Sequence, residues 1–190
     1  ARDVAPGRVT PETQCIEADE VIVAAGGWTD DLLGRDTLDV YARTVAFHEI
    51  GPAEADRLAT MPSLVIESHD DIYILPPVRY PDGKLWLKLG GDPTDDLLQG
   101  KTAITDWYRS GGNAQRGHYL TERIREIIPG LAFESRYHKP CVTTWSKDRL
   151  PEIRRLDAGL TVAAAGNGAG AKCSDELGRM AAAVATGETP

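Results

Sequence analysis

A lysine stands in a predicted β-strand, residues 85–89, that is otherwise built from leucine and tryptophan. Because side chains alternate along a strand, Lys84, Trp86 and Lys88 share one face and the leucines share the other. Two interpretations fit Lys88: a fixed cation that stabilises negative charge developing in a reaction, or one of two lysines on a solvated strand face. The residues alone favour the solvated face. Trp86 is a candidate wall for a small-molecule ligand.

A glycine-rich turn follows the last predicted strand. Residues 166–170 read GNGAG and lead into a helix, an order that invites comparison with the dinucleotide fingerprint GxGxxG. The spacing fails, because Ala171 stands where the third glycine belongs and no βαβ unit with a terminal acid follows. Two interpretations remain: close packing of helix on strand, or an amide-rich helix start that, with Lys172, stabilises negative charge on a ligand.

The remaining reactive side chains give weaker patterns. Cys15, Cys141 and Cys173 are odd in number and lack CxxC spacing, which argues against a disulfide framework or a zinc site and favours reduced thiols. The histidines do not pair at ligand spacing, and His69, beside two aspartates, is better explained by a turn next to a strand than by metal binding. No GxSxG motif is present for a serine hydrolase.

Apolar strands near both ends of the chain would position these groups. Residues 21–25 and 160–165 are continuous apolar runs, the pattern of strands buried on both faces of a parallel sheet. After the first strand and its glycine pair, Thr29 is expected to cap a short helix. After the second strand and its glycine turn, an alanine-rich helix is predicted over residues 174–186.

The middle of the chain predicts an antiparallel sheet. Short strand-like runs separated by turn residues occur at residues 40–50, 63–67, 72–80 and 84–89. The turn Tyr80-Pro81-Asp82-Gly83 would join the last two as a hairpin, since proline fixes φ and glycine allows positive φ. A later helix ends at Pro129-Gly130. Its apolar positions are Leu120, Ile124, Ile127 and Ile128. The sequence therefore predicts an α/β (α+β) fold with an antiparallel insertion between two parallel-type ends.

Composition argues against several classes of partner. The 190 residues are 42% hydrophobic and 26% charged, which is typical of a folded globular protein. A formal net charge of -8, with 21 scattered basic residues, disfavours nucleic acid, whose phosphates need clustered lysine and arginine. No apolar run approaches the roughly 20 residues that a membrane span needs, and no signal peptide is recognisable. We therefore expect a cytoplasmic protein with neither nucleic acid nor membrane as a partner.

Five segments follow one another in an order and spacing typical of a single family. They are ADEVIVAAGGWTDDLL, LKLGGD, IIPGL, CVTTWSKDRLPEI and VAAAGNGAGAKCSDELGRMAAAVATG. Together they resemble the FAD-dependent amine oxidases of the D-amino acid oxidase superfamily, in particular the monomeric sarcosine oxidase and N-methyltryptophan oxidase branch. The resemblance implies part of a Rossmann-like FAD-binding domain, residues 1–36 and 140–190, with an inserted antiparallel-sheet substrate domain, residues 37–139.

The resemblance also implies an activity. Such an enzyme oxidises a secondary amine or an N-methyl amino acid by hydride transfer to flavin, with O2 as the electron acceptor and H2O2 as the product. In the family pattern, Lys88 promotes electron transfer to O2, Lys172 helps to bind the substrate carboxylate, and Cys141 matches the cysteine that links FAD covalently. The glycine turn lies against the flavin ring. The implied cofactor-binding residues are Cys141, Gly168, Ala169, Gly170, Ala171 and Lys172.

Departures from the family pattern leave alternatives open. Asp92 stands where the family often has histidine, and Gly166 and Ala169 replace an aromatic residue and a histidine, so the substrate side chain is not predicted. The family's N-terminal half, with its GxGxxG motif, has no counterpart in this sequence, and we expect it to be supplied in the same or another chain. The alternatives are a flavin-dependent D-amino acid dehydrogenase or deaminase, and a non-catalytic half that needs a partner chain carrying the Rossmann fold.

Overall fold

The computed structural model describes residues 1–67, 70–91 and 94–189, so that His69 and Asp92 lie outside the described residues. Runs of strands are interrupted by helices along the chain, and the predicted mixed α/β class is confirmed. The chain divides into two compact units. The first comprises Ala1–Tyr41, Leu97–Ile104 and Thr143–Pro190, and the second comprises Ala42–Asp96 and Thr105–Val142.

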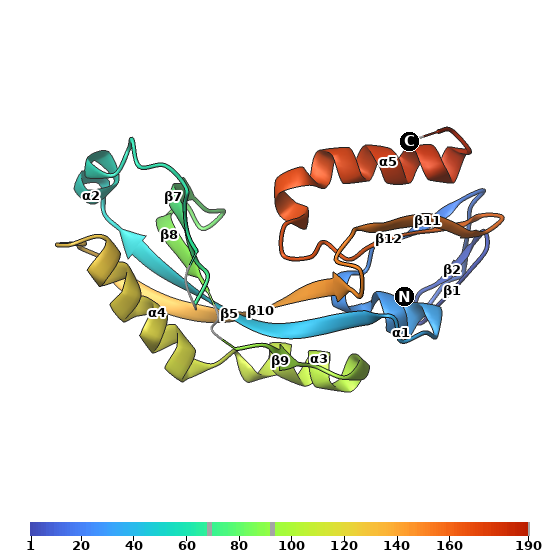
Figure 1. Cartoon of the computed structure of the whole chain (residues 1–190), viewed down its shortest axis with the longest axis horizontal. Helices are drawn as coiled ribbons and strands as arrows, with labels where there is room; N and C mark the ends of the chain where they lie inside the picture. The colour runs from blue at the N-terminus through green and yellow to red at the C-terminus, as the bar shows by residue number, and fades with distance from the viewer. Residues whose placement is uncertain (68–69, 92–93, 190) are drawn as a thin grey trace. The chain divides into compact units, whose positions relative to one another are not determined.

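The second unit is built on an antiparallel sheet whose strand order is β10-β5-β8-β7-β6 (Figure 1). Its strands are β5 (Leu38–Ile50), β6 (Leu64–Ile66), β7 (Ile72–Arg79), β8 (Leu85–Gly90) and β10 (Ser135–Ser146), and β9 (Asp96–Leu97) also pairs with β5. The predicted hairpin joins β7 to β8. Gly83 has a φ of 82° and donates its amide to the Tyr80 carbonyl at 2.9 Å, which confirms the turn.

Helix α4 (Ala114–Ile127) lies against one face of this sheet and forms the core with it. Leu87 and Leu89 of β8 are fully buried in the same cluster as Leu120 and Ile124 of the helix. The short helix α2 (Pro52–Arg57) begins with a proline, as first helical turns often do. The predicted apolar face of α4 and its stop before Pro129 are therefore confirmed.

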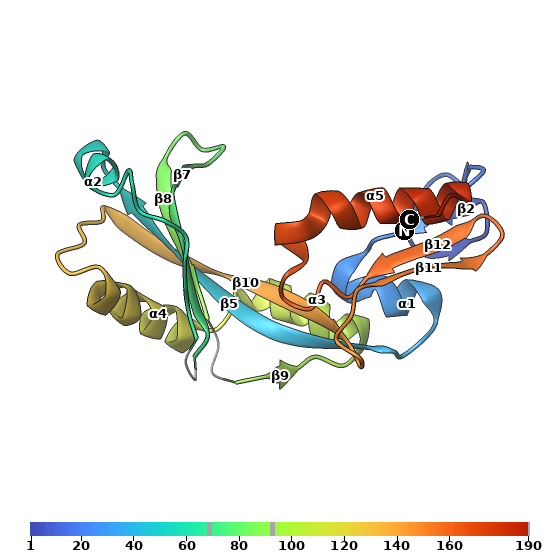
Figure 2. The same ribbon diagram turned by 45° about the horizontal axis from the view of Figure 1, so that its top comes forward.

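The first unit contains a three-stranded sheet in the order β11-β12-β4. These strands are β11 (Glu152–Asp157), β12 (Leu160–Ala164) and β4 (Val21–Val23), and β12 pairs in parallel with β4. Helix α5 (Ser174–Thr186) runs along β11 and β12, as Figures 1 and 2 both show. A second small sheet, formed by β1 (Asp3–Ala5), β2 (Arg8–Thr10) and β3 (Ile16–Glu17), adds Val4 and Val9 to the core around Val21 and Leu160.

Two local expectations about the first strand and helix are wrong. Strand β4 is not buried on both faces: Val21 and Val23 face the core, whereas Ile22, on the opposite face, is 42% exposed. Thr29 does not cap α1 (Thr29–Leu33). The capping position is Trp28, and Thr29 is buried in the first turn, where its hydroxyl has no partner among the described residues.

Several elements were not predicted, among them α3 (Gly100–Ser110), β10 and β11. The sequence of β10 is rich in charge and contains Pro140, features that read as a loop. A proline is tolerated there because β10 is an edge strand. Residues of an edge strand need no hydrogen-bond partner on the side that faces away from the sheet. Within the described residues, none of the helices is both long enough and apolar enough to cross a membrane.

Candidate functional site

The candidate residues of the second unit lie on the sheet face opposite the helix-covered core. Alternation along β8 directs Leu87 and Leu89 toward α4, so Trp86 and Lys88 project from the other face. The register pairs Phe47 with Lys88 and Glu49 with Trp86, which brings Phe47 and Glu49 to the same face. This is the face on which the sequence analysis placed its candidate cation.

The two lysines of this face differ in their partners. Lys84 Nζ lies 2.8 Å from Glu49 Oε1, and the Ser135 hydroxyl also donates to Glu49 at 2.5 Å. The hydrogen bond to Glu49 raises the pKa of Lys84, and the bond from Lys84 lowers the pKa of the Glu49 carboxyl. Lys88 is half-buried and forms no ion pair with any described carboxylate. Its positive charge is therefore the uncompensated one.

An aromatic ring lies beside the Lys88 ammonium. Lys88 Nζ is 5.7 Å from the ring centroid of Tyr73, within the range of a cation–π contact. The ring can lie there because its cross-strand neighbour is Gly90: a Cβ at that position would be 2.4 Å from the Tyr73 ring. The sequence analysis missed Tyr73. The pairing of Tyr73 with Gly90 in the β7–β8 hairpin is the feature that could have indicated it.

Trp86 belongs to a packed aromatic cluster on the same face. Its ring meets those of Tyr137 and Phe47 edge-on, at centroid distances of 4.7 and 6.4 Å, and its indole N–H donates to Asp82 at 3.0 Å. Only 4% of Trp86 is exposed. The Trp86 ring therefore packs within the aromatic cluster. Its role as a wall of the substrate site remains a prediction.

Cys141 packs at the edge of this aromatic cluster and is half-buried on β10. Its thiol points to the Val142 carbonyl, with Sγ and O 3.6 Å apart. The Cys141 carbonyl accepts a hydrogen bond from the Trp107 indole N–H at 2.8 Å, which fixes the outer strand from the side of α3. The second unit thus brings Cys141 and Trp86 into one cluster, with Lys88 two residues further along the same face of β8.

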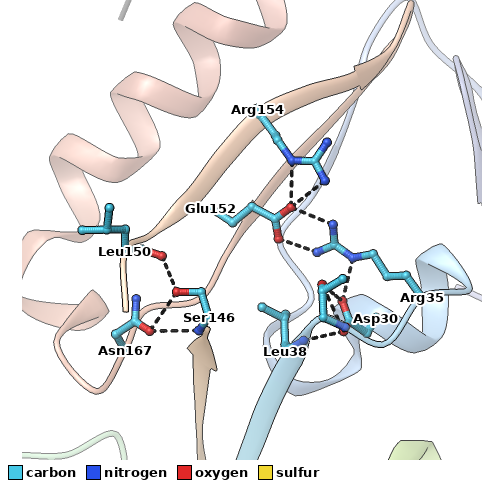
Figure 3. Close-up of polar contacts among 9 residues, drawn as sticks. Asp30, Arg35, Leu38, Ser146, Leu150, Glu152, Arg154 and Asn167 are labelled. Atoms are coloured by element: carbon cyan, nitrogen blue, oxygen red, sulfur yellow. Dashed lines mark hydrogen bonds and ion pairs between the residues drawn. The ribbon is translucent and has the colours of Figure 1, made fainter. Parts of the chain in front are cut away.

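The glycine turn of the first unit is held by Asn167, which the sequence analysis also missed. Asn167 has a φ of 46° and donates its amide to the Thr144 carbonyl at 2.9 Å. Its side chain accepts from the Ser146 amide at 3.0 Å and donates to the Ala165 carbonyl at 2.7 Å. Figure 3 shows the contacts of Asn167 and Leu150 with Ser146. Asparagine tolerates the left-handed conformation and can bond the neighbouring backbone, which explains its presence.

The residues after Asn167 form an open, small-residue segment. Gly168 has a φ of 71°, and a Cβ there would approach Trp145 Cζ2 to 3.2 Å, so glycine lets the turn lie against the indole. A 3-10 turn (η2, Gly170–Cys173) then leads into α5. Ala169, Ala171 and Lys172 are exposed, and Lys172 has no ion pair within the described ranges.

The donor set of this turn fits the predicted cofactor chemistry. Backbone amides and an ammonium suit the polar edge of a ring or a carboxylate, and no acidic side chain occurs between residues 166 and 172. The turn is not a pyrophosphate cradle, because the required glycine spacing is absent from the sequence. The contact of this turn with a flavin ring remains a prediction.

A partly buried ionic cluster lies in the same unit (Figure 3). Arg35 makes two hydrogen bonds to Glu152, at 2.7 and 2.5 Å, and one to Asp30 at 2.6 Å. Burial raises the pKa of the Asp30 carboxyl, but hydrogen bonds from the Thr37 and Leu38 amides and from Arg35 lower it more, so that the pKa falls below its usual value. The cluster connects α1 with β11 and fixes the start of β5.

Comparison with solved structures gives the fold class. The chain is similar to fructosyl amine:oxygen oxidoreductase (Amadoriase I) from Aspergillus fumigatus, with a TM-score of 0.72, 19% identity, and coverage of 100% of this chain and 46% of that chain. It is also similar to a modified fructosyl peptide oxidase from Aspergillus nidulans, with a TM-score of 0.68, 17% identity, and coverage of 93% of this chain and 44% of that chain. A third similar structure is iminodiacetate oxidase from Chelativorans sp. BNC1, with a TM-score of 0.61, 19% identity, and coverage of 92% of this chain and 44% of that chain. The chain thus spans less than half the length of each of these proteins.

The fold, with its strand, glycine turn and closing helix, is that of the FAD-dependent oxidoreductases. The model of the FAD-dependent oxidoreductase family DAO matches residues 1–184, and the chain belongs to this family. A search of curated protein sequences gave no match.

Proposed function

We propose that this chain is the substrate-domain and C-terminal FAD-domain portion of a sarcosine oxidase-like enzyme that oxidises a secondary amine or an N-methyl amino acid and forms H2O2. The observation that carries the proposal is the uncompensated charge of Lys88 beside the compensated charge of Lys84. Names of the fold neighbours add support, since they describe oxidases of a fructosyl amine, a fructosyl peptide and iminodiacetate.

When bound, FAD would supply the acceptor for the substrate's hydride and the route by which electrons reach O2. Lys88 supplies a fixed positive charge that stabilises the negative charge developing on O2 as it accepts an electron. Because the ammonium is half-buried and has no described carboxylate partner, its charge is screened less than that of Lys84. Tyr73 restricts the position of the lysine side chain through its ring.

Lys172 and the exposed turn have a binding role in this proposal. The Lys172 ammonium attracts the substrate carboxylate, and the amides of Gly168, Ala169, Gly170 and Ala171 contribute donors toward the flavin ring. Cys141 is the proposed point of covalent attachment. Its Trp107-anchored carbonyl keeps the strand fixed while the thiol remains half-buried.

The adenosine side of FAD requires residues that this sequence does not contain. We propose that a GxGxxG-bearing half, in the same or another chain, supplies them. The position of β4 supports this: it pairs in parallel with β12 on one side only among the described strands, and Ile22 is exposed. Strands of parallel sheets are normally covered on both faces.

The test is a visible spectrum of the protein isolated from its native source, followed by an intact mass under denaturing conditions. A flavin spectrum and a mass larger than that of the 190 residues are expected. Oxygen uptake with N-methyl amino acids should then rise with pH, because an amine must lose its proton before a hydride can leave. A colourless protein of 190 residues, or flavin that no amine reduces under anaerobic conditions, would contradict the proposal.

A further inference from the structure

A basic hollow lies in the second unit on the face of the sheet opposite Trp86 and Lys88. It has a volume of about 200 Å³ and is lined by residues of α4 and β10, which lie side by side (Figure 1). Tyr137 directs its ring toward Phe47 and Trp86, so its neighbours Arg136 and His138 project toward the helix side. Neither Lys88 nor Trp86 lines the hollow, although Tyr137, which packs on Trp86, contributes to its lining.

Three of the lining side chains are basic or can become so: Arg136, His118 and His138. None of the three forms a hydrogen bond or an ion pair with a carboxylate in the part of the chain that the structure describes. In contrast, Arg123 and Arg125 of α4 are paired with carboxylates of their own helix. The hollow thus concentrates positive charge that the described residues leave uncompensated.

Helix α4 and strand β10 approach each other closely at the wall of the hollow. Gly117 of α4 approaches β10 so closely that a Cβ would lie 2.7 Å from Cγ of His138, and the missing side chain leaves room for the imidazole. Thr121 donates its hydroxyl to the Gly117 carbonyl at 3.0 Å and lies 3.2 Å from Nε2 of the buried His48. Burial lowers the pKa of the His48 imidazole, and the positive charge of Arg136 lowers it further.

We propose that this hollow binds a small oxyanion, a carboxylate or a phosphate group, through Arg136, His118 and His138. Arginine binds both groups through two parallel N–H bonds, and imidazole adds a directed donor. Since a water molecule occupies about 30 Å³ of liquid, the hollow has room for such an anion and its bridging waters. The site does not depend on the proposed oxidase activity.

The test is calorimetric titration of the complete protein with inorganic phosphate and, separately, with succinate, at an ionic strength kept constant with chloride. Saturable binding of one probe is expected, and the probe that binds identifies phosphate or carboxylate as the preferred group. Arg136→Gln should weaken binding about tenfold or more, because a charge-assisted hydrogen bond is lost. Arg125→Gln is the matched control. It also removes one positive charge, but from a position on α4 outside the hollow, and it should change the affinity less than about twofold.

A second measurement needs no variant. Carbethoxylation of His118 and His138, mapped by peptide mass spectrometry, should slow severalfold when the bound probe covers them. The proposal is overturned if neither probe gives saturable binding up to about 10 mM, a range that covers weak sites. It is equally overturned if Arg125→Gln weakens binding as much as Arg136→Gln, or if the bound probe leaves both histidines equally reactive.

Discussion

Lys88 and Tyr73 meet across neighbouring strands, with the lysine Nζ 5.7 Å from the centre of the phenol ring. The contact exists because Gly90, opposite Tyr73, leaves space that any side chain would fill. A ring face attracts a cation without neutralising it. The relationship therefore holds the ammonium in place while its charge remains available.

Lys88→Met should reduce the rate at which O2 reoxidises the reduced enzyme by at least about 100-fold, since about 3 kcal/mol of charge stabilisation would be lost. Reduction of flavin by the amine should change much less. Stopped-flow measurement of the two half-reactions separates these rates.

Lys84→Met is the matched control, because Lys84 projects from the same face but is paired with Glu49. Its reoxidation rate should remain within about threefold of wild type, as its charge is already compensated. Equal losses in the two variants would remove the special role of Lys88. No loss in either would favour a dehydrogenase that passes electrons to a carrier.

Cys141→Ser should release the flavin when the protein is denatured, because the hydroxyl cannot replace a thioether link. Denaturing mass spectrometry of wild type and variant measures the attached cofactor directly. Cys173→Ser, which changes an exposed cysteine in the first unit, should retain the attached flavin. Free flavin from denatured wild-type protein would show that the cofactor is not covalently held at Cys141.

Asn167→Gly and Asn167→Ala separate two effects in the glycine turn. The glycine variant loses the side-chain bonds to Ser146 and Ala165, at a cost of about 1–3 kcal/mol in unfolding free energy. The alanine variant should lose about 1–2 kcal/mol more, because alanine disfavours the positive φ of this position. Urea denaturation followed by tryptophan fluorescence measures both. Equal stability of the two variants would mean that the backbone conformation contributes little.

His48 should make the fold less stable in mild acid. Burial, followed by the nearby charges of Arg136 and Arg125, lowers its pKa from 6.5 to about 4. As the pH falls from 6.5 toward 4, the unfolded state binds a proton that the folded state does not, so stability is lost across that window. The loss amounts to at most roughly 3 kcal/mol. It is absent well above pH 6.5, where the imidazole is neutral in both states.

His48→Leu removes this proton from the balance while Thr121 keeps its bond to the Gly117 carbonyl. The difference in unfolding free energy between wild type and variant should therefore shift with pH between 7 and 4.5, as measured by urea denaturation at each pH. A difference that stays constant across this range would contradict the assignment. Comparing the two proteins cancels the titration of carboxylates that they share.

Arg35→Met should destabilise the first unit by about 1–3 kcal/mol, because the partly buried carboxylates of Asp30 and Glu152 lose their charge-assisted hydrogen bonds. Arg154→Met is the control. Arg154 also bonds Glu152, but its side chain is 57% exposed, and exposed pairs contribute about 0–1 kcal/mol. Thermal denaturation of the two variants measures the difference. Similar melting temperatures would show that the cluster is not a major source of stability.

Local sequence patterns predicted the elements that carry their own signals. The helix over residues 174–186 agrees with α5, and the turn at Tyr80–Gly83 joins β7 to β8 as expected. In contrast, β10 and β11 were missed, because their charged residues and Pro140 resemble a loop until a neighbouring strand is known. Strand pairing depends on distant residues, and short-range periodicity does not contain that information.

The sequence by itself determined the α/β class, the alternation that put Lys84, Trp86 and Lys88 on one face, and the glycine turn before the last helix. These follow from backbone geometry and the chemistry of neighbouring residues. Only the tertiary structure decided that Glu49 pairs with Lys84 and leaves Lys88 uncompensated, and that Asn167 anchors the turn to Ser146. The reason is physical: the charge and the position of a side chain depend on groups that strand register brings close from far along the chain.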